Sequence, residues 1–178
     1  MERELLKSIV EGLIFSHPEP VTPESMASVL PDVSREMIGS VLEELEAEYM
    51  QRSRGFKLCR IAGGYQFRSL PGIAPWILEM KKIKPSKLSR AALEALCIVA
   101  YNQPITRGEI EQIRGVESSA IMRNLLERNL LDVVGKKDVP GRPLLYGTTK
   151  RFLEVFGLAD LASLPPLPPV EPIDDEEE

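Results

Sequence analysis

The pattern of hydrophobic and polar positions changes once within the first 80 residues. Up to about residue 51, apolar residues recur every three or four positions, which is typical of amphipathic helices. After Gly55, apolar and polar residues alternate on both sides of Gly63-Gly64, which is typical of a β-hairpin. The pattern therefore predicts helices over about 2–16, from Thr22-Pro23 onward and from Ser34 to about 51, a hairpin of 56–61 with 65–68, and a short helix over 71–80.

The second half repeats this order of elements. Helical spacing covers about 89–101, and Thr106 and Glu109 have the spacing of a capping box at the start of the next helix. Ser118 is expected to cap a further helix. Residues 130–134 and 144–149 predict a second hairpin, with Pro140-Gly141 in its tip. Phe152, Val155 and Phe156 fit a closing helix.

The two halves align as an internal repeat without a gap. Residues 9–30 match 93–114 at an offset of 84, so that Pro20, Val21 and Thr22 fall on Pro104, Ile105 and Thr106. Three helices followed by a two-stranded wing are the winged form of the helix-turn-helix. We therefore predict a mainly α fold with short β-hairpin wings, built from two tandem winged helix-turn-helix domains. Their expected ranges are 1–80 and 88–164, with a charged linker over 81–87 and a disordered, Pro-rich acidic tail over 165–178.

Charge is divided unevenly along a chain whose net charge is −5. Residues 1–80 carry 12 acidic and 8 basic side chains, 81–158 carry 14 basic and 8 acidic, and the last twenty residues carry 7 acidic and no basic ones. The N-terminal stretch is interrupted by Glu2, Glu4 and Glu11, so it does not fit a signal peptide, and no apolar run could span a bilayer. The cysteines, Cys59 and Cys97, are expected to be reduced core residues of a cytoplasmic protein.

The sequence contains no recognisable set of catalytic or metal-binding residues. His17 is the single histidine, and it has no companions for a triad or a metal cluster. The Gly63-Gly64 turn lacks the lysine and following helix of a phosphate-binding loop. We expect neither an enzyme nor a cofactor, a metal or a small-molecule substrate.

Winged helices commonly read DNA, and the second half is basic. Arg123 and Arg128 on its third helix and Lys136 and Lys137 on its wing are candidates for weak, salt-sensitive phosphate contacts. A solvated face of mixed charge explains the same residues, since acidic side chains lie among them. A DNA-binding transcriptional regulator is therefore the alternative function.

Apolar side chains beyond the needs of a core favour a protein partner. In the second half, the candidates for a protein contact are Tyr101, Pro104, Ile105, Leu144, Leu145 and Tyr146, and Arg142 of the wing is added to them. In the first half, the candidates are Phe67, Trp76 and Ile77. Packing of the wing against its own helices explains many of the same positions. Otherwise they would bind a partner helix or a second protomer.

Two long motifs, NQPITRGEIEQIRGV and PGRPLLYGTT, together with GGYQFRSLPGIAPWI, resemble segregation and condensation protein B, ScpB. The resemblance runs from about residue 3 to Leu164. It implies a non-catalytic subunit of the bacterial SMC condensin complex, cytoplasmic and associated with the nucleoid, that forms a homodimer through its first domain and binds the kleisin ScpA. The SMC ATPase would be reached through the kleisin, and DNA contact would be indirect or weak. The resemblance then implies a dimer interface that includes Phe67, Trp76 and Ile77. It implies that the second-half candidates bind the kleisin.

Overall fold

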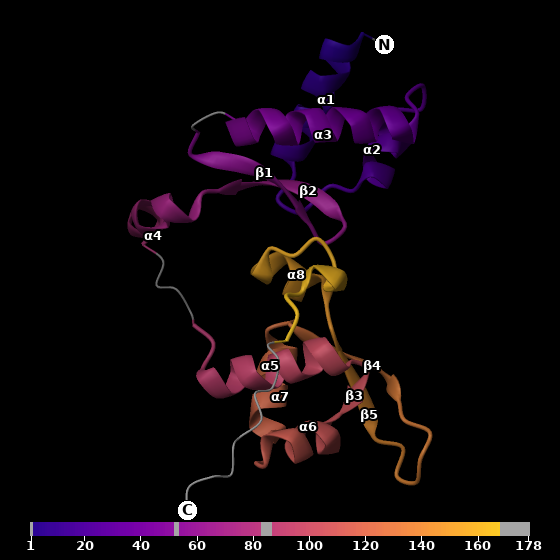
Figure 1. Cartoon of the computed structure of the whole chain (residues 1–178), viewed down its shortest axis with the longest axis vertical. Coiled ribbons are helices and arrows are strands. Elements are labelled where there is room, and N and C mark those ends of the chain that lie inside the picture. The colour runs from indigo at the N-terminus through magenta and orange to yellow at the C-terminus, as the bar shows by residue number, and fades with distance from the viewer. Residues whose placement is uncertain (1, 52–53, 83–86, 168–178) are drawn as a thin grey trace, which may run out of the picture.

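The computed structural model describes residues 2–51, 54–82 and 87–167. Most of the predicted linker, at 83–86, and most of the predicted tail, from 168 onward, lie outside these residues. The first half folds into three helices, a hairpin, a 3-10 turn and a short helix (Figure 1). These elements are α1 (Arg3–Ser16), α2 (Pro23–Val29), α3 (Arg35–Gln51), β1 (Phe56–Ile61), β2 (Gly64–Ser69), η1 (Pro71–Ile73) and α4 (Ala74–Lys81).

The first core lies where α1, α2, α3 and the β1–β2 hairpin meet. Leu6, Val10 and Ile14 form one stripe on α1 because they are spaced by four residues, and all three are buried. They pack with the inner face of α3, formed by Ile38, Val41, Leu42 and Leu45, and with Met26 of α2. The antiparallel β1–β2 pair closes the core through Leu58 and Tyr65.

The second half builds a separate core from the same kinds of element. It contains α5 (Arg90–Asn102), β3 (Ile105–Thr106), α6 (Arg107–Arg114), α7 (Ser119–Glu127), β4 (Leu131–Lys136), β5 (Leu144–Thr148), α8 (Lys150–Phe156) and η2 (Leu161–Ser163). The strands form an antiparallel sheet in the order β3-β5-β4. Leu96, Ile110, Leu125 and Leu131 are the largest fully buried side chains of this core. The expected mainly α-helical chain with small antiparallel sheets is confirmed.

Strand pairing outside the hairpins follows the sequence repeat. In the second half, Ile105 of β3 pairs with Tyr146 of β5. Val21, which aligns with Ile105, forms an isolated antiparallel bridge with Tyr65 of β2. The bridge consists of two backbone hydrogen bonds, from the Val21 amide to Tyr65 at 2.9 Å and from the Tyr65 amide to Val21 at 2.8 Å. In each half, the residue after the turn proline, Pro20 or Pro104, therefore adds a third chain segment to the hairpin.

Local signals for helix starts are confirmed at three positions and wrong at a fourth. The hydroxyls of Thr22, Ser34 and Thr106 each accept a hydrogen bond from the backbone amide three residues later, and Glu109 completes the capping box at Thr106. Ser118 stands before α7, but its hydroxyl makes no capping bond. It accepts from Arg114 at 2.7 Å and donates to the Val116 carbonyl instead.

The expectation that both cysteines are core residues is wrong for Cys97. Its side chain is exposed, whereas Cys59 is half-buried. The buried face of α5 is formed by Ala92, Ala95, Leu96, Val99 and Ala100. Cys97 follows Leu96 directly and is therefore rotated away from this face. An apolar stretch wider than one helix face had suggested burial at every position.

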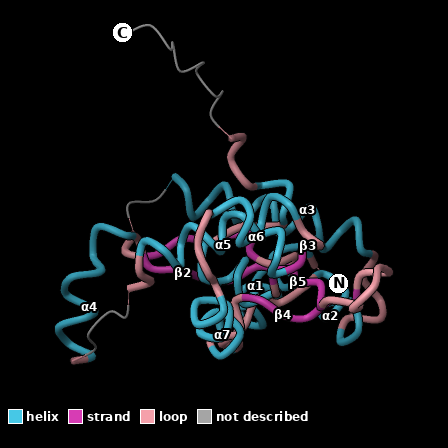
Figure 2. Tube along the Cα trace, turned by 90° about the horizontal axis from the view of Figure 1, so that it is seen from below, coloured by secondary structure: helices cyan, strands magenta, loops and turns pink. Residues whose placement is uncertain are grey.

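The two halves touch through the tip of the first hairpin and the chain around α8. The amides of Ala62 and Gly63, both at positive φ, donate to the carbonyls of Leu158 and Ala159, each at 2.8 Å. Arg68 of β2 donates to the Glu154 carbonyl of α8 at 3.0 Å. By contrast, α4 packs mainly on η1 and stands to one side of the remaining helices (Figures 1 and 2). The hairpin tip therefore links the two cores.

Candidate functional site

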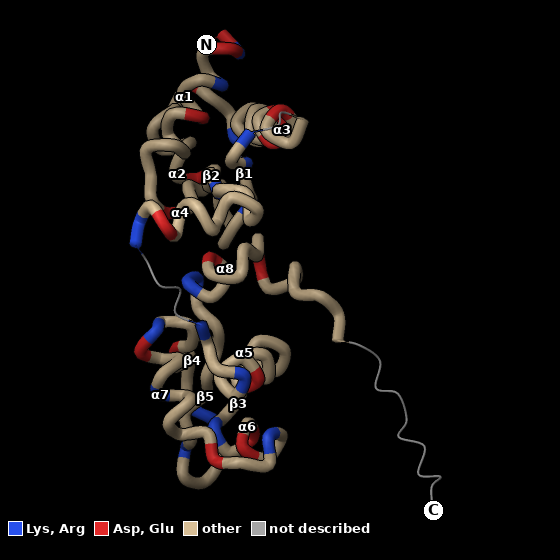
Figure 3. Tube along the Cα trace, turned by 90° about the vertical axis from the view of Figure 1, so that its left-hand side faces the viewer, with Lys and Arg blue, Asp and Glu red and all other residues tan. Residues whose placement is uncertain are grey.

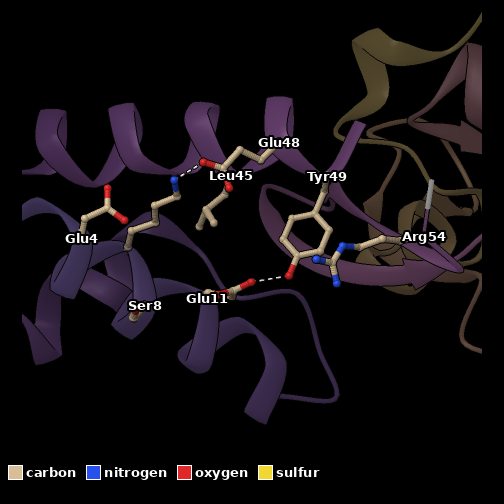
Figure 4. Close-up of a pocket in the computed structure, with 8 residues that line it drawn as sticks. Glu4, Ser8, Glu11, Leu45, Glu48, Tyr49 and Arg54 are labelled. Carbon is tan, nitrogen blue, oxygen red and sulfur yellow. Dashed lines mark hydrogen bonds and ion pairs between the residues drawn. The ribbon is translucent and has the colours of Figure 1, made fainter. Parts of the chain in front are cut away.

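A polar pocket of about 460 Å³ lies between α1 and α3 (Figure 4). Lys7 lies between Glu44, at 3.0 Å, and Glu48, and these hydrogen bonds, that to Glu48 first, raise the pKa of Lys7 above its ordinary value. The Tyr49 hydroxyl donates to Glu11. These polar contacts hold α1 against α3, so the residues that line the pocket have a structural role between the two helices.

The described residues form neither a metal cluster nor a membrane-spanning helix. Within residues 2–51, 54–82 and 87–167, no three His, Cys, Asp or Glu side chains come together in a way that could hold a metal ion. None of the helices in these ranges has both the length and the apolar character required to cross a bilayer. The remaining candidate features are surfaces.

The first such surface is an apolar hollow on α4 and η1. It is lined by Ile73, Trp76, Ile77 and Met80 and measures about 240 Å³. Trp76 is 67% exposed, which is unusual for so large an apolar side chain. We call these four residues the α4 patch. Of the three residues predicted at a dimer interface, Trp76 and Ile77 lie in this patch.

Phe67, the third of those residues, lies elsewhere. It packs against the first core, with its ring centroid 4.9 Å from Tyr49 and 5.6 Å from Phe56, both in edge-to-face contact. It does not line the α4 patch. The structure therefore divides the predicted dimer residues between the exposed helix α4 and a half-buried aromatic cluster on the first hairpin.

The second surface is the wing of the second half, where most of the predicted kleisin-binding residues lie. Arg142 is exposed at the tip, and Leu144, Leu145 and Tyr146 follow one another on β5 with partial exposure. Tyr146 also packs on the second core. Pro104 is exposed beside the base of the wing, in a shallow pocket with Asn102, Glu109 and Ile113.

Two other predicted kleisin-binding residues, Ile105 and Tyr101, make contacts with other parts of the same chain. Ile105 is only 5% exposed and belongs to the second core, and it also lines the floor of the shallow pocket beside Pro104. An apolar residue after a proline turn looks the same in sequence whether it faces the core or solvent. Tyr101 is half-buried at the end of α5, and its hydroxyl donates to the Pro165 carbonyl at 2.5 Å.

The four candidates for DNA contact differ in their surroundings. Arg123, Arg128 and Lys136 are exposed, and Arg128 donates to the Asn124 side chain at 3.1 Å. Lys137 instead reaches back from the wing to Glu109 of α6 at 2.5 Å. Hydrogen bonds from Lys137, and then from the Thr106 amide and hydroxyl, hold the pKa of Glu109 at about 2. Lys137 therefore ties the wing to α6.

Sequence reasoning missed a third surface, a groove where the two halves meet. Arg68 of β2, Arg128 at the end of α7, and Lys150 and Arg151 of α8 all line it. Figure 3 shows Lys and Arg positions beside α8, beneath the first half. These residues are far apart in the sequence, so no local spacing signals their meeting. Only the excess of basic residues in 81–158 pointed in this direction.

Comparison with known proteins identifies the family. The family model of the segregation and condensation complex subunit ScpB matches residues 8–167. Segregation and condensation protein B of Syntrophotalea carbinolica is 48% identical over 161 residues, 90% of this chain and 81% of that protein. A homolog from Coxiella burnetii is 43% identical, over 87% of this chain and 75% of its own length.

A solved dimer of an ScpB N-terminal domain complexed with ScpA peptide is 28% identical, with a TM-score of 0.40. The match covers 43% of this chain and 95% of that one. Identities of 43% and 48% across nearly the whole chain extend well beyond the three segments that carry the resemblance, and they confirm it. The chain belongs to the ScpB family of segregation and condensation complex subunits.

Proposed function

We propose that this chain is a non-catalytic subunit of an SMC–kleisin complex that binds the kleisin ScpA and acts in chromosome condensation and segregation. The observation that carries the proposal is the ScpB family match over residues 8–167. The SMC ATPase would be reached through the kleisin, at the chromosome in the cytoplasm. Nothing in the family match favours the alternative of a transcriptional regulator.

The surfaces that serve this role would belong to two winged-helix domains, at 1–80 and 88–164, joined by the linker at 81–87. Two separate hydrophobic cores support this division; each contains three helices and a hairpin, and Phe152 of α8 adds to the second. The bridges of Val21 and Ile105 to their hairpins support a common plan for both. A winged helix presents its wing and third helix on the outside, so both are available to protein partners.

Binding of ScpA is tested by isothermal titration of the chain with full-length ScpA from the same genome. We expect a saturable complex, and separate elution of the two proteins in gel filtration at micromolar concentration would contradict the proposal. For the wing, Leu144→Glu places a charge on a side chain that is 39% exposed and should weaken the complex. Leu93→Glu, at a leucine of α5 with the same 39% exposure, is the matched control.

Dimerisation would use the α4 patch. A twofold interface buries the same patch of both protomers, so one exposed tryptophan contributes twice. Light scattering should give the mass of a dimer for the unaltered chain and of a monomer for Trp76→Glu. Phe15→Glu alters an aromatic side chain on α1 that is 78% exposed, and it should leave the dimer intact. A dimer that survives Trp76→Glu would place the interface elsewhere.

A further inference from the structure

The groove between the two halves is a built feature with walls from four segments. Pro18 and Glu19 come from the α1–α2 loop, and Gln66, Phe67 and Arg68 from β2. Arg128 and Asn129 come from the end of α7, and Lys150, Arg151 and Glu154 from α8. Its volume is about 750 Å³, larger than the polar pocket between α1 and α3. We call it the junction groove.

Positive charge predominates in the junction groove. Four cations, from Arg68, Arg128, Lys150 and Arg151, face two carboxylates, from Glu19 and Glu154. The Glu154 carboxylate is already bound by Arg151 at 3.1 Å, and its side chain is only 13% exposed. A ligand would therefore meet a surface with an excess of positive charge.

Two uncharged acceptors hold the Arg68 side chain in place. Its guanidinium donates to the Gln66 side-chain oxygen at 2.7 Å and to the Glu154 backbone carbonyl at 3.0 Å. Both acceptors are uncharged, so they orient the group and leave its charge to act on the groove. A fixed guanidinium is well suited to a carboxylate, which it can bind through two parallel hydrogen bonds.

The shape of the junction groove selects a peptide rather than a duplex. DNA readers insert a protruding helix or ribbon into the major groove of the DNA, whereas these cations line a hollow between two bodies. Phe67 and Pro18 add apolar surface beside the charges, which an apolar side chain of a peptide could cover. An extended acidic segment with an apolar residue satisfies both features.

We propose that the junction groove is a docking site for an acidic, extended segment of a partner protein. The proposal rests on the proposed function, in which that partner is ScpA. The segment would contact both halves at once, on the side of the molecule where Arg68 already joins β2 to α8. This contact would be additional to the one proposed at the wing.

The test compares two variants that change net charge equally. Arg128→Gln with Lys150→Glu alters the junction groove, and Glu is well tolerated at the first residue of a helix. Arg90→Glu with Lys87→Gln gives the same change of net charge outside the groove; Arg90 is also the first residue of its helix, and both side chains are exposed. Circular dichroism checks that both variants are folded.

Titration with full-length ScpA distinguishes the outcomes. At ionic strength near 0.1 M we expect the groove variant to bind about tenfold more weakly and the control variant to bind as the unaltered chain does, with the difference shrinking at about 0.5 M salt. If the unaltered chain and both variants bind ScpA with equal affinity, or if both variants lose affinity equally, the junction groove is not the docking site. The proposal that the chain binds ScpA would still stand. Failure of the unaltered chain to bind ScpA would overturn the proposed function as well.

A photoreactive benzoylphenylalanine in place of Lys150 identifies the occupant. Irradiation with ScpA and mass spectrometry should give a cross-link to an acidic ScpA segment. Cross-links confined to a neutral or basic ScpA segment, to this chain's own acidic residues beyond 167, or to duplex DNA added as a competitor would each overturn the proposal.

Discussion

Gly64 gives the most direct test of how the first half is held together. A Cβ added at this position would lie 2.9 Å from both the carbonyl carbon and the oxygen of Val21. Real Cβ atoms do not approach backbone atoms so closely, and the backbone here cannot move aside as a flexible side chain can. Gly64→Ala must therefore push β2 away from the segment at Val21, where the two backbone hydrogen bonds with Tyr65 are made.

The magnitude follows from these two contacts. Overpacking a tight site costs about 1–3 kcal/mol, and each weakened backbone hydrogen bond contributes about 0.5–1.5 kcal/mol. Because the overlap is relieved by losing the hydrogen bonds, the costs are alternatives rather than a sum. We expect a loss of about 2 kcal/mol in the free energy of unfolding.

The measurement is urea unfolding followed by circular dichroism, with hydrogen exchange at the Val21 and Tyr65 amides as a local probe. Gly12→Ala is the control, because Gly12 lies inside α1 with no atom within 4 Å of its added Cβ. That change should stabilise the chain by about 0.5–1 kcal/mol. If Gly64→Ala unfolds at the same urea concentration as the unaltered chain and both amides stay equally protected, β2 does not approach the Val21 backbone as closely as 2.9 Å.

Three further predictions concern the second half. The folded-state pKa of Glu109, about 2, lies below its ordinary value of 4.5, so its contribution to stability is present above pH 4.5 and lost as pH falls toward 2; Lys137→Met should flatten this loss in acid unfolding curves, and an unchanged curve would argue against the contact. Thr106→Ala should cost about 1 kcal/mol through loss of the capping box, while Thr106→Ser retains most of it; equal stability in urea would contradict the capping role. Leu96→Ala empties part of a fully buried site and should cost about 2–5 kcal/mol in the same assay, so a loss below about 1 kcal/mol would not fit the second core.

The elements were largely predictable because their signals are local. The inner stripes of α1 and α3, and the caps at Thr22, Ser34 and Thr106, all follow from residues within one or two turns. β3 was missed because a strand of two residues, Ile105–Thr106, is too short to show alternation. Its sequence counterpart Val21 forms only a single bridge.

Surfaces were less predictable than elements, because exposure depends on which neighbour covers a side chain. Trp76 and Ile105 look alike in sequence as apolar residues near an element end, yet one is exposed and the other is buried in the second core. The junction groove lay beyond local reasoning, since Arg68 and Lys150 are brought together only when the two halves meet. Charge asymmetry between the halves was the one long-range signal that the sequence carried.

The hydrogen bonds from Ala62 and Gly63 to Leu158 and Ala159 also set an order of assembly during synthesis. The first core is complete once β2 has left the ribosome, but the acceptors at Leu158 and Ala159 are made 96 residues after the hairpin-tip amides that donate to them, so this contact closes last. A nascent chain therefore carries a finished first half whose turn amides still face water. Until α8 has been synthesised, the first-half residues of the junction remain exposed to solvent and to other molecules in the cell.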